Sequence, residues 1–258
     1  MVDKQHGREQ RAIFRQFQSE ITPNNSSRGQ RTMEDKPEPH VHHTEEATST
    51  STPIPQQEPG SDLDIHTACF FGDLVRVKYI LSQGQEDING TAGNCLGKTP
   101  LMQAAHGGRK EVFDFLVSEG ADISLLDEYG FNILHWACRG GSVEMVKYIL
   151  SLNGMDVNTT GTDGTTPVAS AAWMGHKDVV DFLVGEGADV TLVSDLDENI
   201  LHWTCQGGNV EMVRYILSQK FVDINARTKM GQTAADIAEV WGHKKVVRLL
   251  KKPRCHVM

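Results

Sequence analysis

Long hydrophobic runs are missing from this chain of 258 residues. No apolar stretch approaches the roughly 18–20 residues that a helix needs to cross a bilayer. The first residues, MVDKQHGREQ, lack the apolar core of a signal peptide, and Val2 excludes N-myristoylation. Cysteine is also scarce, with five residues at no regular disulfide spacing. Together these absences predict a protein of the reducing cytoplasm.

Positive charge is sparse in the body of the chain. Residues 61–242 carry twelve Lys and Arg against twenty-five Asp and Glu, a net charge of −13. Residues 1–60 contribute −2 and residues 243–258 contribute +6, which gives the total of −9. Because an acidic body repels phosphate backbones, we expect no nucleic acid among its partners.

Catalytic and metal-binding signatures are absent as well. The sequence holds no P-loop, no H-E-x-x-H pair and no Ser-His-Asp or Cys-His arrangement. The tract His40-Val41-His42-His43 could hold a metal weakly, but such a tract is more often incidental in a segment of this composition. We therefore expect no enzyme, no metal site and no cofactor.

Residues 1–60 are predicted to form a disordered tail. They are rich in Pro, Ser, Thr and Gln, as in TSTSTPIPQQEPG, and cannot bury enough apolar surface to offset the entropy of ordering. One stretch, QRAIFRQFQSEI, places Ile13, Phe14, Phe17 and Ile21 at helical spacing. It fits a helix that folds on contact with a partner, and equally a transient helix with no partner.

From about residue 61 the sequence repeats itself. A glycine recurs every 33 to 36 residues, and the words around it superpose: GKTPLMQAAHGG, GFNILHWACRGG, GTTPVASAAWMG and DENILHWTCQGG. A second amphipathic pattern, such as VEMVKYIL or DVVDFLV, follows each of these glycines. Neither short helix could bury its apolar stripe alone, so the units must stack into one continuous core. The recurring glycines are Gly72, Gly108, Gly141, Gly175, Gly208 and Gly242.

This period and these words resemble the ankyrin repeat, whose signature is T-P-L-H-x-A in about 33 residues. Thr99-Pro100-Leu101 and Thr166-Pro167-Val168 match its opening, and His66, His135 and His202 stand at its histidine. The resemblance implies an all-α solenoid of stacked helix-turn-helix units with β-turn fingers. It covers residues 61–252, between the disordered tail and a C-terminal tail at 253–258. The six repeats are expected to start near residues 61, 94, 127, 161, 194 and 228.

The six units alternate in type. Odd units share a Lys/Arg-Tyr-Ile-Leu-Ser run, whereas the second and fourth units share Asp-Phe-Leu-Val, which indicates duplication of a two-repeat block of about 67 residues. The third and fifth units also replace Thr-Pro by Asn132-Ile133 and Asn199-Ile200. Since Asn can cap a helix, we expect the fold to survive there.

The resemblance also assigns roles to the repeated polar residues. Cys69, Cys138 and Cys205 take the place of small core residues, and the repeated histidines are expected to order the turns by hydrogen bonding. Partners of ankyrin arrays touch the turn tips and the inner-helix ends, where exposed residues are expected. Aromatic residues and Arg dominate binding energies. The expected partner contacts are therefore Tyr129, Phe131, Arg139, Trp173, Met174 and Trp241. The alternative for some of them is packing against the neighbouring repeat, which is the expectation for Trp136 and Trp203.

The printed sequence ends in Cys255-His256-Val257-Met258, which fits the C-a-a-X pattern for farnesylation of Cys255. Six Lys and Arg precede it from residue 244 onward, and a basic patch is the second signal that one lipid chain requires. Against this, His256 is a loose choice for its position, and Cys255 lies close behind the last expected helix. Both interpretations stay open.

The sequence thus predicts a cytoplasmic, non-catalytic protein-interaction module or scaffold that binds a protein on the concave ankyrin surface. Its acidic body favours a partner with a basic surface. We expect a monomer. The alternative is an adaptor held at the cytosolic face of a membrane through lipidated Cys255.

Overall fold

The computed structural model describes residues 64–91, 96–152 and 154–251. The expected tail over residues 1–60 and the C-terminal tail with Cys255 lie outside these residues, so both predictions about them stay predictions. The part of the chain that is described folds into twelve α-helices without a β-strand, which confirms the predicted all-α class.

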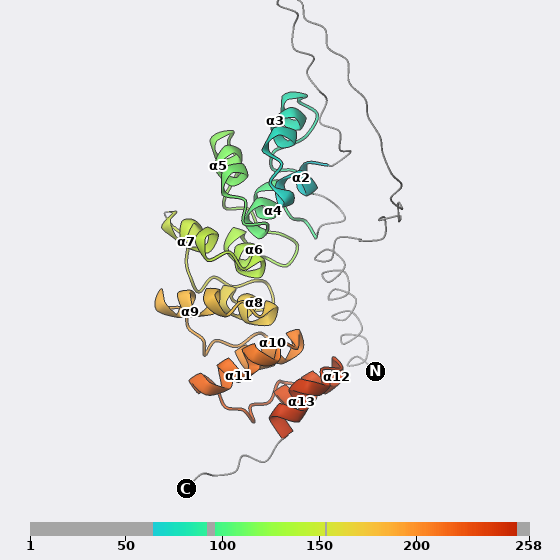
Figure 1. Ribbon diagram of the computed structural model, residues 1–258, viewed down its shortest axis with the longest axis vertical. Coiled ribbons are helices and arrows are strands. Elements are labelled where there is room, and N and C mark those ends of the chain that lie inside the picture. The colour runs from blue at the N-terminus through green and yellow to red at the C-terminus, as the bar shows by residue number, and fades with distance from the viewer. Residues whose placement is uncertain (1–63, 92–95, 153, 252–258) are drawn as a thin grey trace, which may run out of the picture. The chain divides into compact units, whose positions relative to one another are not determined.

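The helices come in six pairs, one pair in each expected unit (Figure 1). We call the first helix of a pair the inner helix and the second the outer helix. Each inner helix contacts the next inner helix along the array, which forms a continuous column. The inner helices are α2 (Ile65–Phe71), α4 (Pro100–His106), α6 (Ile133–Gly140), α8 (Pro167–Met174), α10 (Ile200–Gly207) and α12 (Ala234–Val240). The outer helices are α3 (Leu74–Ser82), α5 (Lys110–Ser118), α7 (Val143–Ser151), α9 (Lys177–Gly185), α11 (Val210–Gln219) and α13 (Lys244–Lys251).

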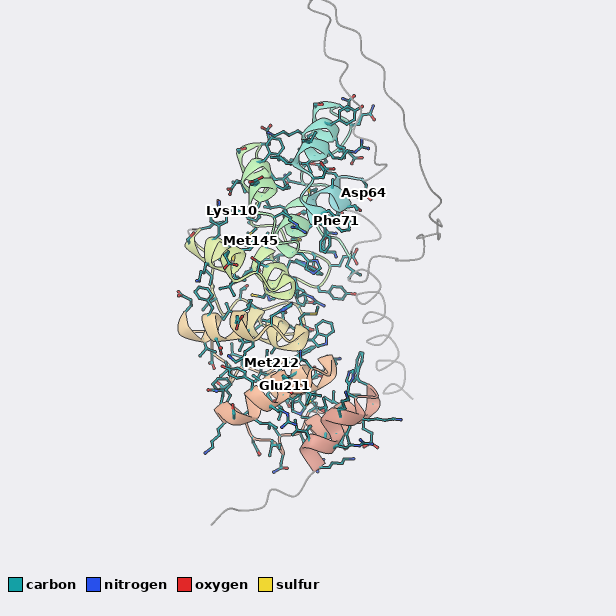
Figure 2. The ribbon with its side chains drawn as sticks, viewed as in Figure 1. Asp64, Phe71, Lys110, Met145, Glu211 and Met212 are labelled. Carbon is teal, nitrogen blue, oxygen red and sulfur yellow. The ribbon has the colours of Figure 1, made fainter. Side chains whose placement is uncertain are left out.

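Apolar side chains fill the space between the two layers of helices. Phe113 and Leu116 of α5 are fully buried, and burial of such a side chain contributes about 1.5–3 kcal/mol. Met145 of α7 and Met212 of α11, one duplicated block apart, occupy equivalent buried positions (Figure 2). The short helices therefore depend on their neighbours, as expected for a stacked array.

The inner helices begin at the caps that the sequence provides. Thr99 accepts a hydrogen bond from the backbone N–H of Met102, and Pro100 occupies the first helical position, where no N–H bond is lost. Where Thr-Pro is absent, the side chain of Asn132 accepts from the N–H groups of Leu134 and His135. Asn199 caps α10 in the same way, so the prediction that Asn preserves the helix start is confirmed.

Glycine is required where successive inner helices touch. A Cβ placed on Gly140 would lie 1.9 Å from the carbonyl oxygen of His106, and one on Gly207 would lie 1.9 Å from that of Trp173. Any side chain there would force the repeats apart. The following residue, Gly141, adopts a left-handed φ of 81°, which ends α6 and turns the chain into α7.

Within the described residues, the third to sixth units each open on a five-residue turn, or finger: finger 3 (127–131), finger 4 (161–165), finger 5 (194–198) and finger 6 (228–232). In each of these fingers the backbone N–H of the first residue donates a hydrogen bond to the backbone carbonyl of the fifth residue. Asp127 donates to Phe131 in this way, and Ser194 to Glu198, both at 3.0 Å. One backbone hydrogen bond joins each finger to the preceding one, as from Asp195 to Asp163 at 2.9 Å. The fingers therefore form a linked row along the array.

The alternation of repeat types is explained by contacts between outer helices. The ammonium of Lys78 in an odd unit lies 5.1 Å from the ring of Phe115 in the next even unit, and Lys147 repeats this contact on Phe182 at 5.3 Å. The even units contact the following odd units differently. Lys110 pairs with Asp114 and lies over the Tyr148 ring.

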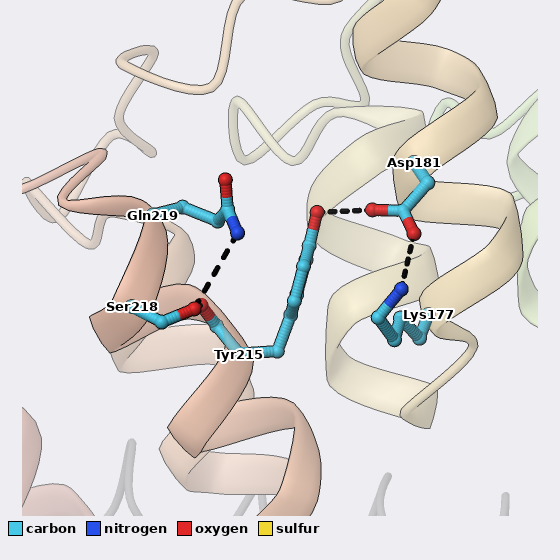
Figure 3. A network of polar contacts seen from close by, with 5 residues as sticks. All are labelled: Lys177, Asp181, Tyr215, Ser218 and Gln219. Carbon is cyan, nitrogen blue, oxygen red and sulfur yellow. Dashed lines mark hydrogen bonds and ion pairs between the residues drawn. The ribbon is translucent and has the colours of Figure 1, made fainter.

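The second block repeats that arrangement. Lys177 pairs with Asp181 and lies over the ring of Tyr215, whose hydroxyl donates to Asp181 (Figure 3). Burial and the hydrogen bond to Asp181 together raise the pKa of Tyr215 to about 12. An odd unit thus needs its Lys and Tyr, and an even unit needs its Asp and Phe, because each serves the interface with the other type.

Candidate partner-binding face

The candidate site is the inner face, which we define as the finger tips together with the last residues of the inner helices. Several large apolar side chains lie open on it. Phe71, labelled in Figure 2, lies at the end of α2 and is 51% exposed, and Val240 at the end of α12 is 43% exposed. Met230 on finger 6 is 40% exposed. The inner face therefore offers apolar surface in its first and last repeats.

Three of the six expected contact residues are accessible on this face. Tyr129 of finger 3, Met174 at the end of α8 and Trp241 just after α12 are each half-buried. Tyr129 and Trp241 combine an apolar ring with a polar group, which suits a surface that partners bind. Partner contact at these residues stays a prediction.

The other three expected contacts do not have the exposure that the sequence suggested. Phe131 and Arg139 are 4% exposed and Trp173 is 9% exposed, so the expectation of open side chains was wrong for them. The guanidinium carbon of Arg139 lies 4.4 Å from the centre of the Trp173 ring, 5.0 Å from Trp136 and 5.6 Å from Phe131. Attraction between the cation and these rings draws the long Arg side chain inward. Whether a partner reaches these three residues stays a prediction.

Beneath the inner face, aromatic and cationic groups stack across repeats. The ring centres of Phe70 and His106 are 5.1 Å apart, and those of His106 and Trp136 are 5.2 Å apart. The ammonium of buried Lys98 lies 4.4 Å from the Trp136 ring. Trp136 and Trp203 are buried, as expected, and Trp173 meets Trp203 with ring centres 6.5 Å apart. This stack fixes the base of the face.

Burial keeps His106 neutral within this stack. It lowers the pKa of His106 to about 3, helped by the positive charges of Lys98 and Arg139. Asp127 supplies the nearby negative charge, and its carboxylate accepts from the indole N–H of Trp136 at 2.9 Å and from the N–H groups of Tyr129 and Phe131. His106 therefore does not titrate in the physiological range, and no proton transfer is indicated at this stack.

The remaining repeated histidines hold the backbone. Asn132 N–H donates to Nδ1 of His135, so Nε2 carries the proton that is donated to the carbonyl of Thr165 at 3.1 Å. His176 and His243 donate in the same way to the carbonyls of Arg139 and Gln206, at 3.0 and 2.9 Å. These contacts bear out the expected scaffolding role. They join neighbouring repeats.

The repeated cysteines are buried core residues, as expected. Cys69, Cys138 and Cys205 are each fully buried and free. Burial raises the pKa of Cys69 and of Cys205 to about 12 and raises that of Cys138 as well, so no reactive thiolate forms at neutral pH. Within residues 64–251, outside the undescribed gaps, no three His, Cys, Asp or Glu side chains group to hold a metal ion. Over the same residues no helix has the length and apolar character to cross a membrane.

Finger 5 contains two residues whose importance the sequence analysis missed. Asp197 adopts a left-handed φ of 60° at the position where fingers 3, 4 and 6 have Gly130, Gly164 and Gly231. The next residue, Glu198, is 8% exposed at the position of Phe131, and burial raises its pKa to about 7. The sequence already held this signal. When fingers 3 to 6 are aligned, finger 5 alone has a residue other than glycine, Asp197, at the fourth position, and an acid, Glu198, follows it.

Comparison of the two duplicated blocks separates the inner face from the outer helices. The outer helices VEMVKYILS of α7 and VEMVRYILS of α11 differ at one residue. Fingers 3 and 5, DEYGF and SDLDE, share none. At the inner-helix ends, Arg139 of the first block is replaced by Gln206, and His106 by Trp173. Divergence is thus concentrated on the inner face.

Comparison with known proteins agrees with this architecture. The family model described as ankyrin repeats (3 copies) matches residues 64–127, 119–194 and 191–258. The palmitoyltransferase AKR1 of Saccharomyces cerevisiae is 31% identical over 212 residues, covering 67% of this chain and 28% of the enzyme. The palmitoyltransferase AKR1 of Lachancea kluyveri is 28% identical, covering 67% of this chain and 24% of the enzyme. A transient receptor potential channel subfamily A member 1 homolog of Caenorhabditis elegans is 34% identical, covering 58% and 12%. The chain thus spans about a quarter of the length of the two palmitoyltransferases.

Proposed function

This chain belongs to the ankyrin-repeat family, and we propose that it is a non-catalytic interaction module that binds a protein on its inner face. The observation that carries the proposal is the contrast between the two blocks: α7 and α11 differ at one of nine aligned residues and α5 and α9 at three of nine, whereas fingers 3 and 5 share no residue. If the whole array served stacking alone, its two faces would diverge alike. If the inner face binds a partner, its side chains must match that partner, so the two blocks diverge there when they contact different parts of it.

The chemistry of the inner face favours a partner with a basic, partly apolar surface. Fingers 3 to 5 carry the exposed acids Glu128, Asp163, Asp195 and Asp197, beside apolar Tyr129 and Met174. With the strong negative charge of residues 61–242, these acids would speed the approach of a basic partner. Raising the salt concentration should therefore slow association more than it changes dissociation.

We take the module to be a cytoplasmic protein without an activity of its own. The three buried free thiols suit a reducing compartment, and their raised pKa values leave them unreactive. The buried histidines are engaged in holding backbone carbonyls. Transfer of palmitate from palmitoyl-coenzyme A by the purified chain would contradict this part of the proposal.

The test compares capture of binding proteins from cells by three forms of the full chain. The inner-face variant combines Tyr129→Ala, Met174→Ala and Trp241→Ala, which remove accessible side chains and leave the buried stack intact. The control variant, Tyr215→Phe, alters the outer helices. Circular dichroism first establishes that all three fold alike. Proteins held by the wild type and the control but lost from the inner-face variant are expected, and equal capture by all three would contradict the proposal.

A second candidate function rests on Cys255-His256-Val257-Met258, which lie outside the described residues. If Met258 ends the protein in the cell, farnesylation of Cys255 would make the same module a membrane-held adaptor. Intact mass of the chain from eukaryotic cells tests this. Loss of three residues with gain of farnesyl and methyl groups, abolished by Cys255→Ser, is the supporting result, and an unmodified mass removes this candidate.

A further inference from the structure

Finger 5 holds a buried carboxyl group with little to stabilise its charge. Glu198 is 8% exposed, and its Oε2 accepts a hydrogen bond from the hydroxyl of Ser194 at 3.2 Å. The same hydroxyl oxygen accepts from the N–H groups of Leu196 and Glu198, at 3.2 and 3.1 Å. Ser194 thus ties the Glu198 side chain to the turn itself. Within the described part of the chain, Glu198 forms no ion pair.

The matching acid in finger 3 has more support. Asp127 stands at the position of Ser194 and accepts from two backbone N–H groups and from the indole of Trp136. Three donors and the nearby Arg139 favour its ionised form against the cost of burial. Glu198 has one hydroxyl donor in place of these three donors and the cation. Ionisation is therefore more costly in finger 5 than in finger 3.

The surroundings of Glu198 add to that cost. Asp163 of finger 4 is the charged group that acts on it most directly, and its negative charge raises the pKa of Glu198 further after burial. Helix α8, beside finger 4, has no titratable residue in its sequence PVASAAWM. The titratable or charged groups on the neighbouring elements are Asp163 of finger 4, Asp195 and Asp197 of finger 5, His202 of α10, and Arg227 and Lys229 at finger 6.

The turn that carries Glu198 is also the least relaxed of the described fingers. Asp197 holds φ at 60°, a left-handed conformation in which the Cβ of an L-residue is crowded by the backbone. Release of the Glu198 side chain into water would remove its bond to Ser194 and let this strain relax. Finger 5 is joined to finger 4 by Asp195 N–H to Asp163 and to finger 6 by Lys229 N–H to Leu196, both at 2.9 Å. A change in finger 5 therefore reaches its neighbours.

We propose that protonation of Glu198 sets the conformation of finger 5, closed over a neutral carboxyl and opened when the carboxyl ionises. The inner face would then present a different surface in repeats 4 to 6 above and below the midpoint. The proton stabilises the folded turn, since the folded carboxyl keeps its proton to higher pH than the unfolded one does. This stabilisation is complete in acid and is lost as the pH rises through about 7.

The test is an NMR titration of the full chain, which needs no partner. The amide signals of Leu196 and Glu198 and the side-chain carboxyl carbon of Glu198 are followed from about pH 5 to about pH 9, a range set by the shifted carboxyl. All three signals should move together with a midpoint near pH 7. In Glu198→Gln the amide movement should vanish, while the matched control Asp195→Asn, which removes an exposed acid of the same finger, should keep it.

A third variant, Asp163→Asn, should move the midpoint to lower pH, because it removes the neighbouring negative charge. A carboxyl carbon that titrates below about pH 5, as an ordinary glutamate does, would overturn the proposal even if Glu198→Gln failed to fold. Persistence of the amide transition in folded Glu198→Gln would overturn it too, by assigning the change to another group such as His202. The consequence for binding rests on the proposed function. Failure of the titration with inner-face capture intact would reject the switch alone, and the reverse result would reject the binding role alone.

Discussion

The two duplicated blocks, residues 94–160 and 161–227, are alike in the side-chain contacts between their outer helices and differ in the residues of their fingers. Lys110, Asp114 and Tyr148 of the first block recur as Lys177, Asp181 and Tyr215. At the equivalent inner positions Asp127 becomes Ser194 and Phe131 becomes Glu198. The outer contacts join successive repeats from the first to the fifth, so a change there would disturb the stacking. The described fingers are joined mainly by backbone hydrogen bonds, which tolerate a change of side chain; the Thr162 hydroxyl, which donates to the Tyr129 carbonyl, is an added side-chain contact.

This difference separates two kinds of constraint within one chain. Contacts made by side chains, such as Lys over Tyr, preserve residue types through duplication. Contacts made by the backbone, such as the closing bond of each finger, preserve shape and leave the side chains free to change. The exposed side chains of the fingers are therefore the ones that can change with the least loss of stability.

The largest expected effect tests what the two blocks share. Gly140→Ala and Gly207→Ala each place a methyl group 1.9 Å from a carbonyl oxygen of the preceding inner helix. Both should lower the free energy of unfolding by about 3 kcal/mol, since neither backbone can move without separating repeats. Urea unfolding measures the loss. Gly185→Ala in α9, where a methyl group would meet no atom within 4 Å, is the control and should be neutral or slightly stabilising. Tolerance at Gly140 or at Gly207 would break the claim of a common frame.

The next effect should separate the blocks. Trp136→Phe removes the hydrogen bond to Asp127 and part of the stack with Lys98 and Arg139. Trp203→Phe removes no hydrogen bond found within the described residues. We expect losses of about 2 kcal/mol for Trp136→Phe and about 1 kcal/mol for Trp203→Phe, because the first leaves a buried carboxylate short of a donor. Thermal unfolding of both variants checks the order. Equal losses would mean that the Asp127 bond contributes nothing.

The array itself could be predicted from the sequence because its signals are periodic. Thr99-Pro100 and Asn132 indicate helix starts, and the recurrent glycines indicate turns, so the repeats can be predicted from the spacing of these residues. The exposure of individual residues could not be predicted the same way. Arg139 and Trp173 stand at inner-helix positions where the resemblance predicts exposed side chains. They pack together instead, because the rings of Trp136 and Trp173, from two neighbouring repeats, both contact the Arg139 guanidinium. The contact between Arg139 and Trp173 joins residues 34 positions apart and leaves no mark in either repeat alone.

A smaller effect tests the divergence of the fingers directly. Asp197→Gly should raise the free energy of unfolding by about 0.5–1 kcal/mol, since glycine adopts the left-handed φ of 60° without steric cost. The reverse change at the duplicate position, Gly130→Asp, should cost about 1–2 kcal/mol for the same reason, and more if the new Cβ, 2.9 Å from the backbone nitrogen of Thr162, cannot be relieved. Chemical denaturation of both variants at one pH gives the comparison. A loss on Asp197→Gly would show that the aspartate side chain itself stabilises finger 5.

The smallest effect tests the outer contacts, where the two blocks should behave alike. Tyr148→Phe and Tyr215→Phe remove hydroxyl groups beside Asp114 and Asp181, in surroundings where solvent screens the charges. Each should cost about 0.5 kcal/mol or less, and the two values should agree within measurement error. Ultraviolet titration of the tyrosines offers a second measurement, because the pKa of both hydroxyls is raised and that of Tyr215 reaches about 12. If one substitution cost far more than the other, the outer contacts would have diverged as well, and divergence would no longer single out the inner face as the binding surface.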